Sequence, residues 1–238
     1  MPVEAPERIE MDTTKITEVD LKYLDFDTSS LSTGKIKQDL DSLLSTYTNK
    51  HGKHEKDDLG VVAGRFQPPH LGHLYQILAG LEVAKELVVV IGSANADINN
   101  PDPRDEKAVK LDIDNPFPAT EREFLLTHLL EKIGKERNED LLKRVSFVHL
   151  DDVGNNEKWG NNLVDAVEAK KKGQQIDVIV ANDGWVKKIF DTYWLHTFPV
   201  PFLKKPSGKR YEATGKRVQL RDEGRMAAKG AHIVVGRG

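Results

Sequence analysis

The sequence contains no cysteine, which excludes disulfide bonds and metal sites built on thiolates. It has no run of about 18 apolar residues, so we expect no membrane-spanning helix. Its acidic start, MPVEAPERIEMD, has no apolar core, and we expect no secretory signal there. The net charge of −3 gives no sign of nucleic-acid binding. The expectation is therefore a cytoplasmic protein with neither membrane nor nucleic-acid partners.

The residues that are present indicate a folded domain behind an N-terminal extension. Hydrophobic residues make up 38% of the 238, enough for a core beneath a heavily charged surface. Residues 1–58 hold 13 acidic against eight basic residues and one amphipathic stretch, from Ile36 to Leu44. We interpret them as an acidic arm that ends in a polar linker, with a disordered tail as the alternative. Residues 59–238 then form the second, larger domain.

Four apolar runs without alternation predict strands that are buried on both faces of a sheet. The runs are 59–64, 86–94, 146–150 and 176–182. Stretches with helical spacing follow them, at 70–85, 119–135, 163–172 and 183–195. This alternation predicts an α/β fold with a doubly wound parallel sheet. Because ligands of such sheets bind beyond the carboxyl ends of the strands, we expect the chemistry there.

Two polar segments have no place in this scheme. The stretch from Asn95 to Asp114 is long for a loop, which is typical of lids, binding loops or disorder. The stretch from Lys204 to Arg225 holds eight basic against three acidic residues. It is either a solvated surface or a set of cations that binds a polyphosphate.

The strongest motif is GRFQPPHLGH, from Gly64 to His73, directly after the first predicted strand. His70 and His73 are three residues apart at the start of a predicted helix, so both rings lie on one side of its first turn. A helix N-terminus favours phosphate, and Gly72 leaves room for a ligand. Phosphate recognition is the interpretation we favour. The alternatives are a metal site, for which a third ligand is missing, and a purely structural role of the two histidines.

These residues resemble the HxGH signature of the nucleotidylyltransferase superfamily. The lead-in GRFQP is most similar to nicotinamide mononucleotide (NMN) adenylyltransferases of the archaeal type, whose fold is Rossmann-like. Three further segments are similar to that family: NPFPATERE at 115–123, NNEKW at 155–159 and IDVIVANDG at 176–184. The segment RYEATGKRV, at 210–218, departs from the family pattern, with Glu212 and Ala213 where serine and glycine are usual.

The resemblance implies transfer of AMP from ATP to NMN, which yields NAD and pyrophosphate, with Mg²⁺ accompanying ATP and no protein side chain as metal ligand. It leaves self-association into a homo-oligomer open. It assigns catalysis to His70, His73 and Arg122, and the acceptor site to Trp159 and Asn182. The remaining residues that it assigns bind ATP or its phosphates: Gly64, Arg65, Phe66, Gly72, Thr214 and Arg217.

Simpler interpretations of single residues stay open. Arg65 could be a surface arginine, Arg122 could form a helical ion pair with a neighbour four residues away, and Trp159 could be a core residue, although the polar stretch around it offers little core. For the whole chain, one alternative is a related nucleotidylyltransferase with another phosphorylated acceptor or with CTP as donor. The other is a non-catalytic nucleotide-sensing module.

Overall fold

The computed structural model describes residues 34–51, 55–94, 117–182, 185–191, 195–205 and 207–211. Residues 1–33 of the predicted arm, the predicted loop at 95–114, Thr214 and Arg217 lie outside these ranges. Within the described residues, no helix combines the length and the apolar character needed to cross a lipid bilayer.

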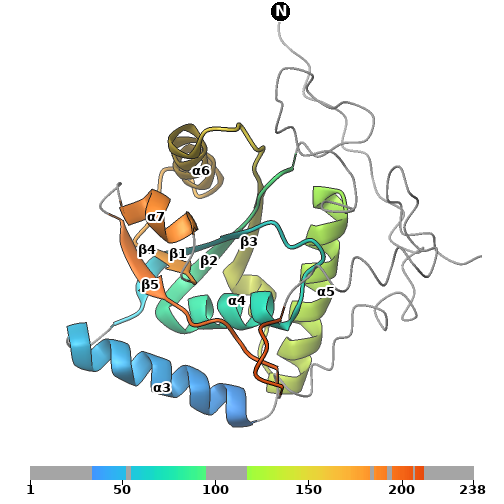
Figure 1. Ribbon diagram of the computed structural model, residues 1–238, viewed down its shortest axis with the longest axis vertical. Coiled ribbons are helices and arrows are strands. Elements are labelled where there is room, and N and C mark those ends of the chain that lie inside the picture. Colours follow the sequence, from blue (N-terminus) through green and yellow to red (C-terminus); the bar gives the residue numbers. More distant parts are fainter. Residues whose placement is uncertain are drawn as a thin grey trace, which may run out of the picture.

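Five parallel strands form one sheet in the order β3-β2-β1-β4-β5 (Figure 1). They are β1 (Asp57–Gly64), β2 (Ala84–Ile91), β3 (Val145–His149), β4 (Val178–Ala181) and β5 (His196–Pro199). The central pair, β1 and β2, runs in register from Asp57 opposite Ala84 to Gly64 opposite Ile91. Each contains five consecutive buried residues, as expected for strands covered on both faces.

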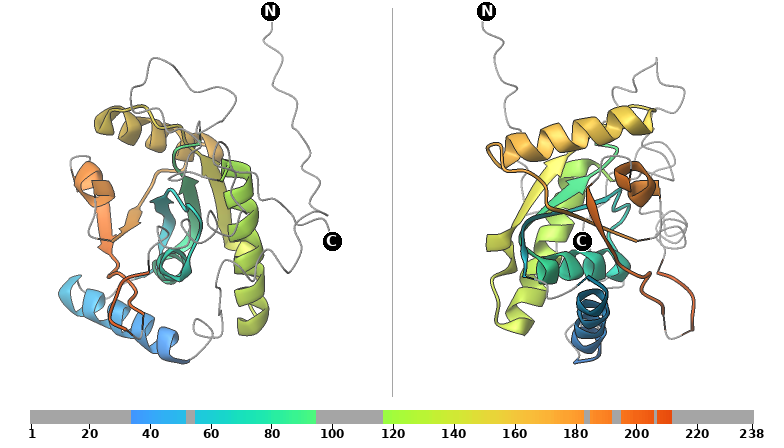
Figure 2. Two further views of the ribbon diagram at one scale, coloured as in Figure 1. Left: turned by 45° about the vertical axis from the view of Figure 1, so that its right-hand side comes forward. Right: turned by 90° about the vertical axis from the view of Figure 1, so that its left-hand side faces the viewer.

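Helices cover both faces of this sheet (Figure 2). On one face lie α4 (Leu71–Val83) and α5 (Ala119–Arg137), and on the other α6 (Asn156–Lys170) and α7 (Trp185–Asp191). A short 3-10 helix, η2 (Leu141–Arg144), leads into β3. The arrangement confirms the predicted doubly wound α/β fold, with a separate apolar core on each side of the sheet.

One helix of the predicted arm lies on the domain. α3 (Gly34–His51) contains the amphipathic stretch predicted at Ile36 to Leu44 and packs against α4. Its Leu40 is buried in the core on the α4 side, and Leu43 and Leu44 are half-buried there. The division of the chain at residue 58 stays a prediction.

Two elements differ from the sequence prediction. β5 was not predicted, because His-Thr-Phe-Pro contains no apolar run and belongs to an edge strand. α6 begins at Asn156 rather than near Leu163, because the side chain of Asn155 caps it and accepts a hydrogen bond of 2.8 Å from the Lys158 N–H. The extension adds about two helical turns, and these carry Trp159.

The strand order places a topological switch point between β1 and β4. From β1 the chain proceeds through β2 to β3 on one side, and then crosses to β4 and β5 on the other. Loops that leave the carboxyl ends of β1 and β4 therefore diverge, and the crevice between them is where sheets of this kind bind ligands.

Candidate active site

A cavity of about 430 Å³ lies at this switch point. Its walls come from the ends of β1, β2, β3 and β4 and the first turns of the helices that follow. Five of the predicted site residues line it: Gly64, Arg65, His73, Trp159 and Asn182. The volume suits a nucleotide-sized ligand, since ligand pockets commonly span about 300–1,000 Å³.

His70 and His73 form a stacked pair at the start of α4. Their ring centroids are 3.6 Å apart with an interplanar angle of 22°. The backbone N–H of His70 donates a hydrogen bond of 3.1 Å to Nδ1 of His73. Since Nδ1 accepts this bond, the neutral ring carries its proton on Nε2. His73 thus brings a neutral N–H donor to the cavity wall.

Both imidazoles are uncharged near neutral pH. Burial, with a smaller contribution from the neighbouring Lys205, lowers the pKa of His70 to about 4. Burial and then His70 hold the pKa of His73 well below its ordinary value. Each neutral imidazole can still donate one N–H to a phosphate oxygen, and the helix N-terminus adds positive potential at the same point.

Phe66 and Gly72 support the histidines from behind. Phe66 is fully buried and contacts the ring of His73 edge-on, with centroids 4.9 Å apart. A Cβ added at Gly72 would lie 3.1 Å from the imidazole of His70 and 3.6 Å from Cβ of Tyr211. The space at Gly72 is therefore occupied by the protein's own side chains, and neither residue lines the cavity.

Arg122 is fully buried and binds main-chain carbonyls. Its Nη1 donates to the carbonyl oxygens of Arg65 at 2.6 Å and Gly92 at 2.7 Å, and its Nη2 donates to that of Ser93 at 3.0 Å. Its Nε donates to the carbonyl of Pro118, the residue directly before α5. Burial, and then Arg65, lower its pKa to about 10.

These contacts make Arg122 a clamp between the loops after β1 and β2. The predicted phosphate contact of Arg122 stays a prediction, because its described hydrogen bonds all go to the backbone. No helical ion pair of Arg122 occurs within the part of the chain that the structure describes.

Gln67, like Arg122, forms hydrogen bonds between the GRFQP segment and the region where α5 begins. Its buried side chain donates 2.9 Å to the carbonyl of Phe117 and accepts 3.0 Å from the Phe117 N–H. The GRFQP and NPF segments, which are 50 residues apart in sequence, are thereby fixed to each other. This explains physically why a glutamine follows the phenylalanine in the signature.

Trp159 is both a core residue and a wall of the cavity. It is 6% exposed, belongs to the same buried cluster as Leu163, and lies 6.4 Å from the ring of Phe190. One edge of its indole lies 3.8 Å from the position of a Cβ at Gly92 and faces the cavity. The expectation that it has little core around it was wrong, because α6 begins early enough to bury it.

Sequence reasoning missed several residues of the cavity wall. Gln76, one turn after His73, donates a hydrogen bond of 2.8 Å to the carbonyl of Val180. Asp152 receives hydrogen bonds from the Ser93 hydroxyl, at 3.5 Å, and from the Gly154 N–H. The other missed residues are Ala63, Gly92, Asn155, Asn156 and Val186. Ser93 and Asp152 lie just beyond strand ends, where the sequence predicted the chemistry without assigning either residue to the site.

A family model described as cytidylyltransferase-like matches residues 61–203, which span β1 to the segment after β5. The chain belongs to the cytidylyltransferase-like family. Within this family, the resemblance to archaeal NMN adenylyltransferases is confirmed. A nicotinamide-nucleotide adenylyltransferase of Aeropyrum pernix is 30% identical over 159 residues, which cover 67% of this chain and 76% of that one.

Two further relatives of this cytidylyltransferase-like chain are similar over shorter parts of their length. A nicotinamide/nicotinic acid mononucleotide adenylyltransferase of Acinetobacter baylyi is 32% identical over 114 residues, half of its own length. A solved structure of a bifunctional NMN adenylyltransferase/ADP ribose pyrophosphatase from Francisella tularensis has a TM-score of 0.54 and 26% identity. That match covers 70% of this chain but 43% of the other.

Proposed function

We propose that this chain is a nicotinamide-nucleotide adenylyltransferase, which makes NAD and pyrophosphate from ATP and NMN. The observation that carries the proposal is one cavity at the β1–β4 switch point that joins His73, at the start of α4, to Trp159, at the start of α6. The first suits a phosphate and the second a flat base. The names of the relatives support the same activity.

The reaction needs no nucleophile from the protein. A 5′-phosphate oxygen of NMN attacks the α-phosphorus of ATP, and the bond from that phosphorus to the α,β-bridging oxygen breaks. AMP becomes joined to NMN through a pyrophosphate link, and the β- and γ-phosphates leave as pyrophosphate. Catalysis then consists of positioning and charge stabilisation.

In this mechanism Nε2–H of His73 donates a hydrogen bond to a phosphate oxygen as charge develops there. His70 is not on the described cavity wall, but it stacks on His73 and places a second imidazole beside it. Arg65, which is exposed and lines the cavity, supplies a positive charge. Trp159 contacts the nicotinamide ring, and the amide of Asn182 hydrogen-bonds the acceptor. Phosphate contacts of Thr214 and Arg217 remain predictions from the sequence.

A divalent cation accompanies ATP in this proposal, and we propose Mg²⁺. Among the described residues no group of three or more His, Asp or Glu could hold a metal ion, and Asp152 is the one carboxylate on the described cavity wall. Phosphate oxygens and water suffice as Mg²⁺ ligands, so the ion enters as part of the substrate. A solved structure of the Francisella tularensis enzyme, similar to this chain with a TM-score of 0.52, is described as complexed with AMP and a manganese ion.

The proposal is tested by incubating the chain with Mg²⁺, ATP and NMN and measuring both NAD and pyrophosphate. Parallel reactions replace NMN by nicotinic acid mononucleotide or another phosphorylated acceptor, and ATP by CTP. We expect equal amounts of NAD and pyrophosphate with ATP and NMN. Pyrophosphate release only with another acceptor or with CTP would instead assign the site to a different nucleotidyl transfer. No turnover with any pair would indicate a nucleotide-sensing module.

A further inference from the structure

A basic hairpin follows β5 and folds back toward the start of α4. It comprises residues 203–205 and 207–211, in which Lys204 and Arg210 form an antiparallel bridge. The Lys205 N–H donates 2.7 Å to the carbonyl of Lys209, and the Gly208 N–H donates 2.8 Å to that of Lys205. Gly208 has a φ of 80°, which favours glycine and closes the turn.

The hairpin is attached to the domain at its base. Leu203 and Tyr211 pack against the core on the α4 side, and the Tyr211 N–H donates to the Leu203 carbonyl. Tyr211 lies beside Gly72, since its Cβ is 3.6 Å from the position of a Cβ there. The hairpin therefore lies beside the HxGH turn, and Figure 1 shows it next to the start of α4.

Tyr211 also positions one lysine. The ammonium of Lys205 lies over its ring, 5.5 Å from the centroid. Because Tyr211 lies against Gly72, this contact holds the charge of Lys205 close to His70, and that charge contributes to the lowered pKa of His70. No carboxylate of the described residues forms an ion pair with Lys205. The charge is thus available to an anion.

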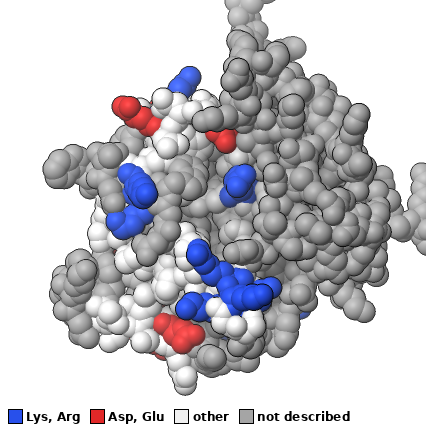
Figure 3. Space-filling model, in the orientation of Figure 1, with Lys and Arg blue, Asp and Glu red and all other residues white. Residues whose placement is uncertain are grey.

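His73, His70 and Lys205 are successive neighbours, and the first of them lines the cavity. His73 lines the cavity, His70 stacks on it at 3.6 Å, and Lys205 lies beyond His70. A triphosphate held at His73 therefore has His70 and then the hairpin as its neighbours on that side of the cavity. Figure 3 shows Lys and Arg side chains gathered over the hairpin and, separately, over α7.

We propose that Lys205 binds the ATP phosphates that leave as pyrophosphate, as a cation that the hairpin and Tyr211 place beyond His70. This inference rests on the proposed adenylyl transfer. It explains why two neutral imidazoles suffice at the start of α4, because Lys205 adds a positive charge beside them to that of Arg65. It also gives one member of the basic stretch a specific role.

Lys205→Met is the test, because methionine retains an aliphatic stem over Tyr211 and removes the charge. We expect the dissociation constant of Mg-ATP, measured by calorimetry, and the KM for ATP to rise about tenfold, the usual effect of losing one charge-assisted hydrogen bond. The KM for NMN should stay within about twofold, and Lys205→Arg should restore most of the ATP affinity.

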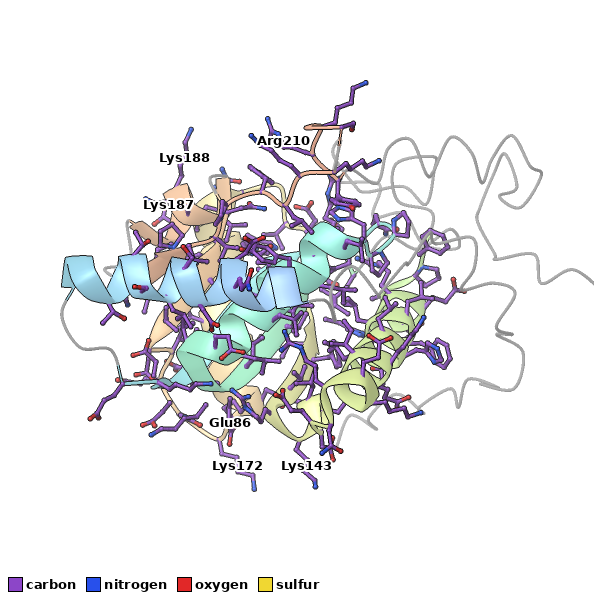
Figure 4. The ribbon with its side chains drawn as sticks, turned by 90° about the horizontal axis from the view of Figure 1, so that it is seen from below. Glu86, Lys143, Lys172, Lys187, Lys188 and Arg210 are labelled. Carbon is purple, nitrogen blue, oxygen red and sulfur yellow. The ribbon has the colours of Figure 1, made fainter. Side chains whose placement is uncertain are left out.

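Lys143→Met is the matched control, since Lys143 is exposed and lies on the opposite side of the molecule from the hairpin residue Arg210 (Figure 4). Parental ATP affinity in Lys205→Met, or an equal loss in Lys143→Met, would overturn the inference. If the parent forms no NAD, the proposed function fails, yet calorimetry with Mg-ATP still tests Lys205. If the parent forms NAD and Lys205→Met binds ATP normally, the role of Lys205 alone is wrong.

Discussion

At the scale of single residues, the tautomer of His73 is the detail that most affects the chemistry. The Nδ1 atom is committed to the His70 N–H, so only Nε2 can donate to a substrate. His73→Asn separates these functions, because the asparagine side-chain oxygen can still accept from His70, whereas its shorter side chain places no N–H at the position of Nε2. We expect kcat to fall by about 100-fold or more with little change in melting temperature. A variant with parental kcat would remove His73 from the mechanism.

Trp159 needs a different substitution because it also belongs to the core. Replacement by alanine would cost about 3–5 kcal/mol of stability, so a loss of acceptor binding could not be told from a loss of folding. Trp159→Leu retains most of the buried apolar volume and removes the aromatic face. We expect the KM for NMN to rise about tenfold, because stacking of a base on an aromatic ring contributes about 1–3 kcal/mol. The KM for ATP should change by less than about twofold. Equal increases in both constants would mean that Trp159 acts through packing alone.

At the scale of elements, two arginines join strands and helices through carbonyl contacts at opposite ends of the sheet. Arg122 does so beside the cavity, and Arg144 binds the carbonyls of Lys85, Ala84 and Leu81 where α4 ends and β2 begins.

Arg122→Met should lower the free energy of unfolding by at least about 3 kcal/mol, because several buried carbonyls lose their donor. It should also abolish transfer, because the loops after β1 and β2 lose their common anchor.

Arg144→Met is the matched variant at the far end of the sheet. We expect a loss of stability with nearly parental kcat/KM, measured by urea unfolding and by NAD formation on the same preparations. Loss of activity in both variants in proportion to stability would show that Arg122 contributes only to folding.

The elements also show which features a sequence can predict. Runs such as VVAG and LVVVIG predict central strands because burial on both faces leaves no room for polar residues. β5 has no such run, since an edge strand needs fewer apolar side chains, and the start of α6 depends on the cap at Asn155. The partners of Arg122 could not be predicted, because backbone carbonyls carry no sequence signal. The cavity wall was predicted in part, at the strand ends, and the site roles remain predictions.

At the scale of the whole molecule, α3 can be separated from the site. A chain that begins at Asp57 retains every predicted site residue but exposes the surface of α4 that Leu40 covers. We expect it to fold, to form NAD at nearly the parental rate and to melt at a lower temperature. Leu40→Ala in the full chain should reproduce part of this loss, about 2–5 kcal/mol. A shortened chain that is folded but inactive would give α3 a part in the site.

The stability of the fold should depend on pH through the buried histidines. The pKa of His70 is about 4 in the folded state against 6.5 for an unperturbed histidine, so between these values the unfolded chain binds more protons. The His70 contribution is thus complete above pH 6.5 and is lost as pH falls toward 4. Burial raises the pKa of Glu121 to about 7, which acts in the opposite direction.

A comparison with His70→Gln isolates this contribution from that of Glu121. Chemical denaturation of both proteins at pH 7.5, 6, 5 and 4.5, roughly spanning the titration range, should show a smaller acid-induced loss of stability in the variant. Identical slopes in the two proteins would mean that His70 titrates normally in the folded state.

Among the described strands β5 forms one edge of the sheet, and this edge affects how the protein behaves at high concentration. The Val200 N–H donates to the carbonyl of Ala181 in β4, so by alternation Thr197, Pro199 and Pro201 direct their backbone nitrogens away from the sheet. Two of these three nitrogens carry no hydrogen. A foreign strand that approached this edge would find one N–H donor where a continuous ladder needs three, and its pairing would stop after a single step. Edge-to-edge pairing of strands between two molecules, which would lead to aggregation, is therefore disfavoured along β5 at any chain concentration.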